Sequence, residues 1–288
     1  MHDPDDRSAT EIHPPIPAWQ KEWSEAGWTP EHEARMGALR FDVFDDGAER
    51  AIDNLAIDTA LLHDVAEGRR EAVFRMWDWS ERAVILGSYQ SVGAEIDAAV
   101  ARAHGFSFAR RMSGGGAMVV EPARTLTWSV VVPEHVVEGL SFVASFAFLD
   151  AWCVRALRAH GVPATYRPIN DIATVDGKLA GAAQCRRRRT VLHHTTMAWD
   201  LDNALMFDLL RLAQKRTNPR AVASAVKRVA PLSQYVDCSH GDMRRFLLRT
   251  FAALHDTAAG VRTDEDLARV DELVQTKFAT QEWMYRVP

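Results

Sequence analysis

Cysteine is rare in this 288-residue sequence: only Cys153, Cys185 and Cys238 occur, and they are widely spaced. Such scattered cysteines exclude a disulfide framework and a zinc knuckle, and they favour a reducing, cytoplasmic location. No apolar run approaches the roughly 18 residues that cross a bilayer. The acidic, proline-bearing N-terminus also lacks the apolar segment of a signal peptide. We therefore expect a cytoplasmic protein with no membrane partner.

Lysine is scarce as well, because the 34 basic residues comprise 29 arginines and five lysines. The formal net charge of −5 gives no general reason to expect nucleic acid as a partner. Arginine cannot replace lysine where a compact ammonium must fit a pocket. Lys178, between Gly177 and Gly181, is the best candidate for such a position.

Apolar residues make up 47% of the sequence, so the chain can bury a sizeable core. Strand and helix patterns alternate irregularly, without repeated βαβ units. This order predicts an α+β fold with helices packed against a mainly antiparallel sheet. We expect a partly disordered N-terminal arm over residues 1–36, a main domain over residues 37–260 and a C-terminal helical extension over residues 261–288.

The segment from Arg110 to Ala117 carries the first chemical pattern. Three glycines, Gly114, Gly115 and Gly116, follow a predicted strand and can present N–H groups as an anion nest. Arg111 can offer a charge-assisted fork to a phosphate or a carboxylate. The ordinary alternative is a flexible turn beside solvated arginines. The spacing matches neither the dinucleotide fingerprint nor the P-loop.

Lys178 lies between two predicted strands, which cover residues 171–175 and 180–185. An ammonium there could neutralise a carboxylate, an α-phosphate or a developing oxyanion. Asn170 and Asp171 add an amide and a carboxylate nearby, and Asp171 could hold Mg²⁺ or orient the lysine. The alternatives are a hairpin-turn lysine that faces solvent and an aspartate that caps a turn.

His193 and His194 lie on a predicted strand over residues 190–200, so they should point to opposite faces. We expect one to face the core or the pocket and the other to face solvent, which disfavours metal binding by the pair. The run from Arg186 to Arg189 is typical of a solvated loop, or of a site for an acidic partner or phosphates. Cys185 is the only cysteine near these segments, and we expect it to be inert.

Taken in order, these segments resemble the lipoate–protein ligase A family, within the biotin/lipoate ligase superfamily. The resemblance covers roughly residues 38–286. Its individual motifs are short, but their ordered set is specific. The matching stretches are Asn54–Leu62, Leu86–Gln90, Arg110–Ala117, Asn170–Ile172, Gly177–Gln184, Leu192–Asp200, Ser224–Val229, Lys277–Phe278 and Glu282–Tyr285.

The resemblance implies an α+β fold with a central mixed sheet flanked by helices, and a two-step reaction. Lipoate and MgATP would give lipoyl-AMP and pyrophosphate. The lipoyl group would then pass to a lysine of an acceptor lipoyl domain, of the 2-oxoacid dehydrogenase E2 or glycine cleavage H protein type. Lys178 would act electrostatically on the acyl carbonyl and the α-phosphate. The residues expected around the lipoyl adenylate are Arg111, Ser113, Gly114, Gly115, Gly116, Ala117, Asn170, Asp171, Gly181, Ala183, His193 and His194, with Asp171 also expected to hold Mg²⁺.

Two features depart from the family pattern. Val120 and Glu121 occupy the places of a His-Asp pair that many members carry. The chain also ends at Pro288, where longer members begin an accessory domain. The options are a separate accessory protein, a ligase that works alone, or a transferase that uses preformed acyl donors.

Two other functions stay open. One is an ATP-independent octanoyl or lipoyl transferase between carrier proteins. Related octanoyltransferases use a cysteine nucleophile, but residues 162–169, where we would expect it, contain none. The other is a non-catalytic scaffold that binds a lipoyl domain.

Overall fold

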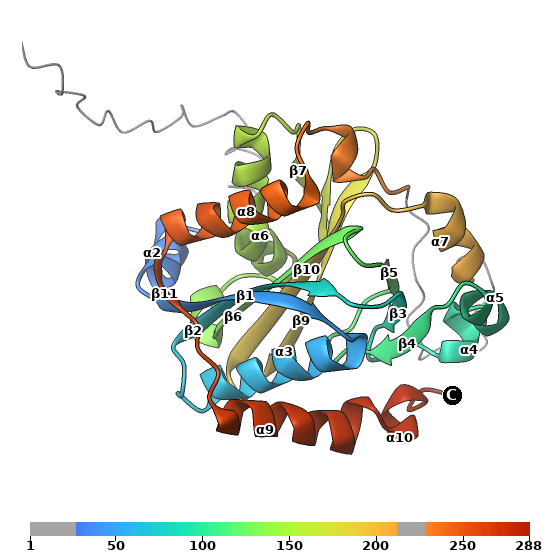
Figure 1. The fold of residues 1–288 in the computed structure, drawn as a ribbon. Coiled ribbons are helices and arrows are strands. Elements are labelled where there is room, and N and C mark those ends of the chain that lie inside the picture. Colours follow the sequence, from blue (N-terminus) through green and yellow to red (C-terminus); the bar gives the residue numbers. More distant parts are fainter. Residues whose placement is uncertain (1–26, 212–227) are drawn as a thin grey trace, which may run out of the picture.

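A computed structural model describes residues 27–211 and 228–288 (Figure 1). Within these residues the main sheet has eight strands in the order β11-β1-β2-β6-β10-β9-β8-β7. Strand β1 runs parallel to β2 and β11, and every other neighbouring pair is antiparallel. The predicted mixed, mainly antiparallel sheet is therefore confirmed. The strands are β1 (Arg40–Glu49), β2 (Ala72–Trp79), β6 (Thr125–Pro133), β7 (Thr165–Arg167), β8 (Asp171–Ala173), β9 (Lys178–Arg187), β10 (Thr190–Ala198) and β11 (Asp256–Ala259).

A small sheet with the order β4-β3-β5 lies beside the main sheet. Its strands are β3 (Ala83–Leu86), β4 (Ser107–Arg110) and β5 (Met118–Val120). The short helices α4 (Val92–Glu95), α5 (Ala98–Ala103) and α7 (Asn203–Leu209) surround this sheet, on the right-hand side of Figure 1. The sequence from Glu95 to His104, followed by Gly105, predicts one continuous helix over residues 95–104. This prediction is wrong, because Ile96 is extended and pairs with Leu210 between α4 and α5.

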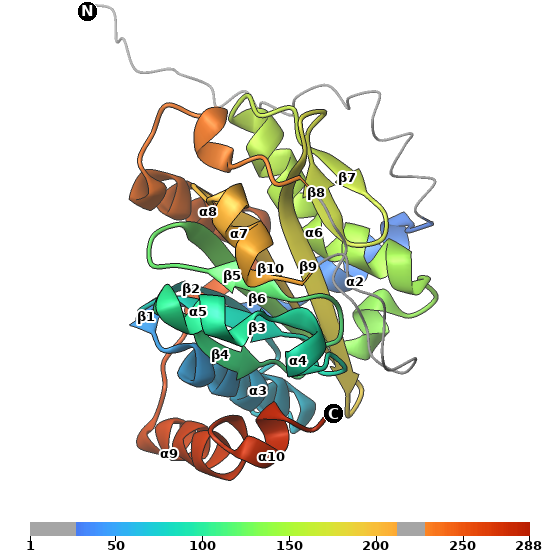
Figure 2. The same ribbon diagram turned by 90° about the vertical axis from the view of Figure 1, so that its right-hand side faces the viewer.

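Helices cover both faces of the main sheet. Helix α3 (Ala51–Ala66) packs on one face, and α6 (Phe142–Ala159) and α8 (His240–Leu254) lie on the other (Figures 1 and 2). Helix α9 (Asp264–Leu273), the π-helical turn η3 (Val274–Phe278) and α10 (Gln281–Met284) form an outer layer beyond α3. Helix α2 (Pro30–Gly37), within the expected N-terminal arm, packs beside the 3₁₀ turn η1 (Glu134–Val137).

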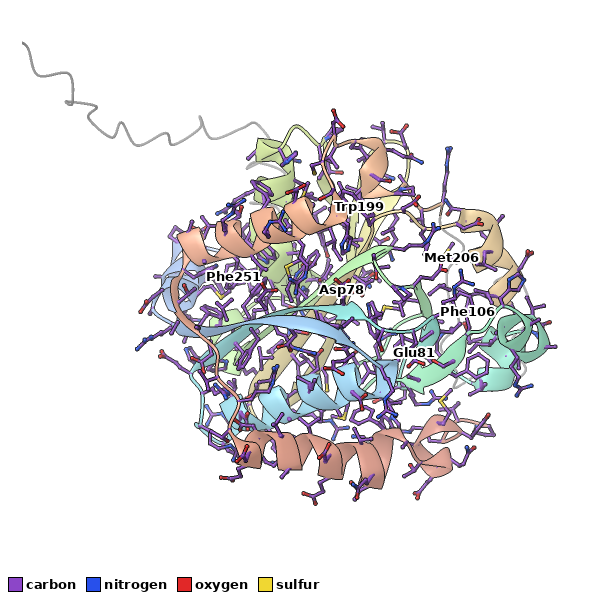
Figure 3. All side chains as sticks on the ribbon, in the orientation of Figure 1. Asp78, Glu81, Phe106, Trp199, Met206 and Phe251 are labelled. Carbon is purple, nitrogen blue, oxygen red and sulfur yellow. The ribbon has the colours of Figure 1, made fainter. Side chains whose placement is uncertain are left out.

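The main core lies between the sheet and helices α6 and α8. Phe74 stacks on Phe251, with ring centroids 3.8 Å apart, and Trp152 meets both rings edge-on. Figure 3 shows Phe251 on α8. Aromatic side chains bury the most apolar area per residue, so this cluster contributes strongly to the attachment of α6 and α8.

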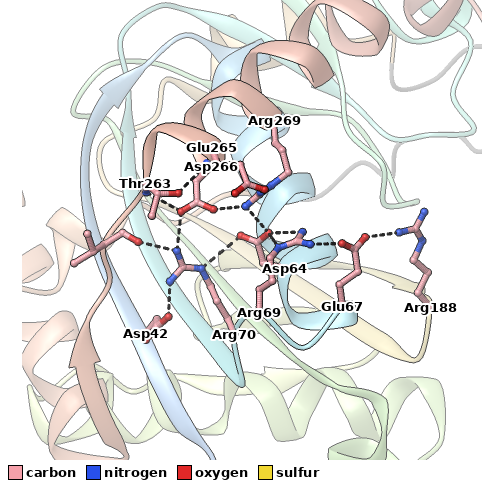
Figure 4. Close-up of polar contacts among 11 residues, drawn as sticks. Asp42, Asp64, Glu67, Arg69, Arg70, Arg188, Thr263, Glu265, Asp266 and Arg269 are labelled. Atoms are coloured by element: carbon pink, nitrogen blue, oxygen red, sulfur yellow. Dashed lines mark hydrogen bonds and ion pairs between the residues drawn. The ribbon is translucent and has the colours of Figure 1, made fainter.

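The outer helical layer is tied to α3 by ion pairs (Figure 4). Asp64, near the end of α3, pairs with Arg69 at 2.7 Å and with Arg269 of α9 at 3.2 Å. Arg70 pairs at 3.2 Å with Asp266, which lies in the first turn of α9. The Asp64 side chain is only 2% exposed, so this network is screened less than a surface pair would be.

Candidate active site

The pocket that could hold a ligand lies between the glycine loop (residues 113–116), the first half of β9 and the adjoining part of β10. Its volume is about 280 Å³, which suits a small ligand. Its polar lining includes Lys178, Asn170 and His194. An apolar wall near α7 includes Leu201, Leu210 and Met206, the last of which Figure 3 shows on α7.

Lys178 is the first residue of β9, and its side chain turns back toward β8. Its Nζ lies 2.9 Å from Asp171 Oδ1, and the side chain is only 28% exposed. Gly181 makes room for this conformation, since a Cβ there would lie 2.2 Å from the lysine Nζ. Lys178 is therefore a pocket residue and not a hairpin-turn lysine in solvent.

Asn170, just before β8, binds Ala182 of β9 through both its side chain and its main chain. Its Nδ2 donates to the Ala182 carbonyl at 2.5 Å, and its carbonyl accepts the Ala182 N–H at 2.9 Å. Asn170 also lines the pocket, whereas Asp171 does not and instead pairs with Lys178.

The described residues contain no group of three or more His, Cys, Asp or Glu side chains placed to hold a metal ion. One carboxylate, Asp171, lies at the edge of the pocket region. This donor set does not form a metal cage made by protein alone. It fits a Mg²⁺ held mainly by the phosphates of a bound nucleotide, as is usual for that ion.

Arg111 holds the glycine loop. Its Nη2 donates to the carbonyls of Gly114 and Gly116, at 2.7 and 2.8 Å, and its Nη1 donates to the Ile85 carbonyl. Burial lowers the pKa of Arg111 to about 10, so the guanidinium is still a cation at neutral pH. We expected the Arg111 guanidinium to bind a ligand. The side chain does line the pocket, but the N–H groups of its guanidinium donate to the glycine loop instead.

Arg110 points the other way and ties the loop to the C-terminal segment. Its Nη1 donates to the carbonyls of Gly87 and Gln90. Its Nε and Nη2 both donate to the Met284 carbonyl, at 2.9 Å and 2.6 Å. Trp283 Nε1 returns a hydrogen bond to the Arg110 carbonyl at 2.8 Å. Helix α10 therefore holds the end of β4, the strand that leads into the glycine loop.

Glycine is needed at positions 87 and 115, where two backbone segments pack against each other. A Cβ on Gly87 would lie 2.1 Å from the Gly115 carbonyl oxygen, and Gly115 has a positive φ of 93°. Both positions therefore favour glycine for steric reasons.

Ser113 and His194 form a buried hydrogen-bonded chain with Asp58 of α3. Ser113 Oγ lies 2.6 Å from His194 Nε2, and His194 Nδ1 lies 3.2 Å from Asp58 Oδ2. Burial is the main cause of the lowered pKa of His194, so its imidazole is neutral at pH 7. Asp58 was absent from the predicted site; its only sequence signal is a carboxylate inside an apolar helical pattern.

His193 lies on the opposite face of the sheet, near α6. Its Nε2 is 3.0 Å from Asp150 Oδ1, and its Nδ1 is 3.2 Å from Gln184 Nε2. The two histidines point to opposite faces as predicted, but the prediction that one faces solvent is wrong. Helices cover both faces here, so His193 and His194 are 0% and 8% exposed.

The pocket brings together most of the predicted site residues but not all of them. Those that line it are Arg111, Gly115, Gly116, Ala117, Asn170, Lys178, Gly181, Ala183 and His194. Ser113 and Gly114 belong to the same loop, and Asp171 reaches the site through Lys178. His193 does not line the pocket. The apolar wall near α7 was not predicted, because spacing alone does not show which helix closes a cavity.

The run of arginines does not form one continuous patch. Arg186 donates to Ser145 Oγ at 2.7 Å, and Arg188 pairs with Glu67 at 2.8 Å on the other side of the sheet. Arg188 and Arg189 have positive φ angles and form the β9–β10 turn. Arg186 still belongs to β9 whereas Arg188 lies in the turn, so the change of chain direction separates these charges.

Residues 50–252, more than half of the chain, match the model of the lipoyl protein ligase A/B catalytic domain. The protein belongs to this family. Within the family it is 27% identical over 267 residues to an octanoyltransferase LipM of Exiguobacterium, covering 81% of this chain and 94% of the relative. It is also 27% identical over 242 residues to a lipoate-protein ligase A subunit 1 of Thermoplasma acidophilum, covering 80% and 90%.

Solved structures agree on the lipoate ligase fold. A bipartite lipoate protein ligase of Thermoplasma acidophilum, studied with its E2 lipoyl domain, matches with a TM-score of 0.72 and 22% identity, covering 87% of this chain and 98% of that one. A lipoate-protein ligase A bound with ATP matches with a TM-score of 0.70 and 24% identity, covering 87% and 99%. At these identities the likeness shows the fold alone.

One departure from the family pattern, at Val120 and Glu121, has a structural account. Val120 is buried in the core beneath the small sheet, and Glu121 pairs with Arg82 at 3.0 Å. Neither residue lines the pocket. The place of the family's His-Asp pair is therefore used here for packing and for an ion pair.

No cysteine lines the pocket among the described residues. Cys153 and Cys185 are buried, and burial raises the pKa of both thiols. A thiolate nucleophile is therefore disfavoured at these two positions, which agrees with the expectation that Cys185 is inert.

Proposed function

We propose that this protein is a lipoate–protein ligase that activates lipoate with MgATP to lipoyl-AMP and transfers the lipoyl group to a lysine of an acceptor lipoyl domain. One observation carries the proposal. The pocket is lined by both the ammonium of Lys178 and an apolar wall, and among the residues that the structure describes no cysteine that could form a thioester lines it. An acyl adenylate needs the cation and the apolar wall, whereas a thioester mechanism needs the thiol.

In this proposal the apolar wall near α7 would take the acyl chain. Lys178 would lie by the acyl carbonyl and the α-phosphate, where a fixed cation stabilises the charge that develops during transfer. Gly115, Gly116 and Ala117 would let the adenylate approach the main chain closely. Lys178 would act through its charge and would form no covalent bond.

The cofactors and partners belong to the same proposal. ATP and Mg²⁺ would supply the activation step, with Asp171 as the protein carboxylate nearest to Lys178. The acceptor would be a lipoyl domain of the E2 or H protein type, and a separate accessory protein could assist. Within the described residues no helix has the length and apolarity of a membrane span. The cytoplasmic location stays a prediction.

The decisive experiment mixes the purified protein with lipoate, MgATP and a lipoyl domain, and measures pyrophosphate release and acceptor mass. Lipoate-dependent signals in both assays would support a ligase that works alone. Silence in both, with transfer restored by added lipoyl-AMP, would mean that activation needs an accessory protein. Silence with lipoyl-AMP as well would overturn the proposal.

A second candidate is an ATP-independent octanoyl or lipoyl transferase, because several relatives are octanoyltransferases of the LipM type. It predicts acyl transfer from an octanoylated carrier protein without ATP, and a thiol reagent should then trap a cysteine. Transfer that survives replacement of Cys153, Cys185 and Cys238 by alanine would exclude a cysteine-dependent transferase.

A further inference from the structure

The buried chain from Asp58 through His194 to Ser113 joins helix α3 to the glycine loop through the sheet. We infer that Asp58 is a positioning residue, which selects the tautomer of His194 and thereby anchors Ser113 and the glycine loop. The structural part of this inference stands on geometry alone. Its effect on activity rests on the proposed function.

Asp58 lies in a site that is only 1% exposed. Its Oδ1 accepts from Arg75 Nη1 at 3.1 Å, and its Oδ2 accepts from Ser129 Oγ at 2.7 Å. Arg75 is also paired with Asp46 at 2.5 Å. The positive charge of Arg75 therefore compensates the buried carboxylate, which would otherwise be costly.

This carboxylate decides where the imidazole proton lies. An ionised carboxylate only accepts hydrogen bonds, so His194 must donate Nδ1–H to Asp58 Oδ2. A neutral imidazole then has a bare Nε2, which can only accept. The partner of Nε2 is Ser113 Oγ at 2.6 Å, and the hydroxyl must therefore donate to it.

Ser113 is thus held from two sides. Its hydroxyl donates its proton to His194, and its oxygen accepts Arg111 Nε–H at 3.0 Å. The last two residues of the loop, Gly115 and Gly116, line the pocket. Arg111 also donates to the Gly114 and Gly116 carbonyls. Ser113 therefore anchors the start of the loop, and Arg111 holds the part that follows it.

Asp58→Asn should reverse the direction of the hydrogen bonds between residue 58, His194 and Ser113. Arg75 cannot accept a hydrogen bond, so the asparagine oxygen should face Arg75 and its amide should face His194. The amide would donate to Nδ1, which moves the imidazole proton to Nε2. Ser113 Oγ would then meet two donors, His194 and Arg111, and its own proton would lose its acceptor.

The neighbouring histidine provides a matched control. Asp150 lies 3.0 Å from His193, so it makes the same kind of buried Asp–His contact on the other face of the sheet. His193 does not line the pocket. Asp150→Asn therefore changes a similar pair without touching the glycine loop.

The test uses the full-length protein labelled with ¹⁵N-histidine, and it measures the His194 tautomer by NMR alongside lipoate-dependent pyrophosphate release. The His194 signals are assigned by their loss in His194→Gln. In the wild type we expect the Nδ1–H tautomer. Asp58→Asn should show the Nε2–H tautomer and a fall in kcat/KM of about tenfold or more. Asp150→Asn should keep the wild-type tautomer at His194 and the wild-type kcat/KM.

Two results would overturn the inference. One is an Nε2–H tautomer of His194 in the wild-type protein, which is informative even if Asp58→Asn does not fold. The other is a folded Asp58→Asn protein whose kcat/KM falls no further than that of Asp150→Asn. If the wild type releases no pyrophosphate and transfers nothing from lipoyl-AMP, the proposed function fails, while the tautomer measurement still tests the role of Asp58.

Discussion

At the scale of single residues, the site depends on one ammonium held in a defined place. Lys178→Ala should lower the rate of lipoyl transfer by about 10²- to 10³-fold, because a preorganised charge that stabilises a transition state is worth that much. Pyrophosphate release and acceptor mass measure the effect. Lys178→Met, which keeps the length of the side chain, should be equally inactive, and retained activity in either variant would contradict the role of the charge.

Gly181 offers a subtler test of the same ammonium. A Cβ at Gly181 would lie 2.2 Å from Lys178 Nζ, so Gly181→Ala should displace the lysine. The atoms that must move are the flexible end of a side chain, so the free energy of unfolding should stay close to the wild-type value. We expect a large loss of activity with an unchanged denaturation midpoint.

Gly93→Ala is the matched control, because a Cβ at Gly93 meets nothing within 4 Å. It should keep full activity. Wild-type activity in Gly181→Ala would show that the position of the ammonium seen here is not needed for the reaction.

At the scale of elements, helix α10 supports the glycine loop through Trp283. The indole donates to the Arg110 carbonyl, and its ring packs between Lys277 and Arg286. Trp283→Ala should raise KM for lipoate and cost roughly 1–3 kcal/mol of stability, since both packing and a hydrogen bond are lost. Steady-state kinetics and urea denaturation measure the two effects separately.

Trp283→Phe keeps most of the ring packing and removes only the N–H donor. We expect it to lie between the wild type and Trp283→Ala in both measurements. If Trp283→Ala loses stability but keeps its KM, helix α10 stabilises the fold without supporting the loop.

At the scale of the whole molecule, a half-buried histidine should make stability depend on pH. His255 packs against Phe41 and Phe251, and burial lowers its pKa to about 4. In the unfolded chain a histidine has a pKa near 6.5. Between these values the unfolded state binds the proton and the folded state does not, so the free energy of unfolding falls as pH falls from about 6.5 toward 4.

The urea midpoint of the wild type should therefore decrease from pH 7 to pH 5, and His255→Phe should decrease less. The lowered pKa of His194 acts in the same direction, so some pH dependence should remain in the variant. Parallel pH curves for the wild type and His255→Phe would contradict this account.

Much of the architecture could be predicted from the sequence, because local patterns specify individual elements. Alternating apolar residues over Leu39–Phe44 predict the strand β1, and helical spacing over Asn54–Leu62 predicts the helix α3. The apolar stretch Phe142–His160 predicts α6, and the predicted strand over residues 190–200 corresponds to β10. The short strands β5, β7 and β11 were missed, since three or four residues carry too little periodicity. The break between α4 and α5 also escaped prediction, because it depends on pairing with Leu210, far away in the sequence.

The sequence by itself determined the chemical groups of the site: a lone lysine between glycines, a glycine loop after an arginine pair, and two adjacent histidines. Only the tertiary structure decided how they are used. In the folded protein Arg111 donates to the glycine loop, both histidines are buried between helices, and Asp58 lies within hydrogen-bond distance of His194. The physical reason is that a residue's type is local, whereas its partners, its burial and its protonation depend on elements that meet only when the sheet and its helices pack together.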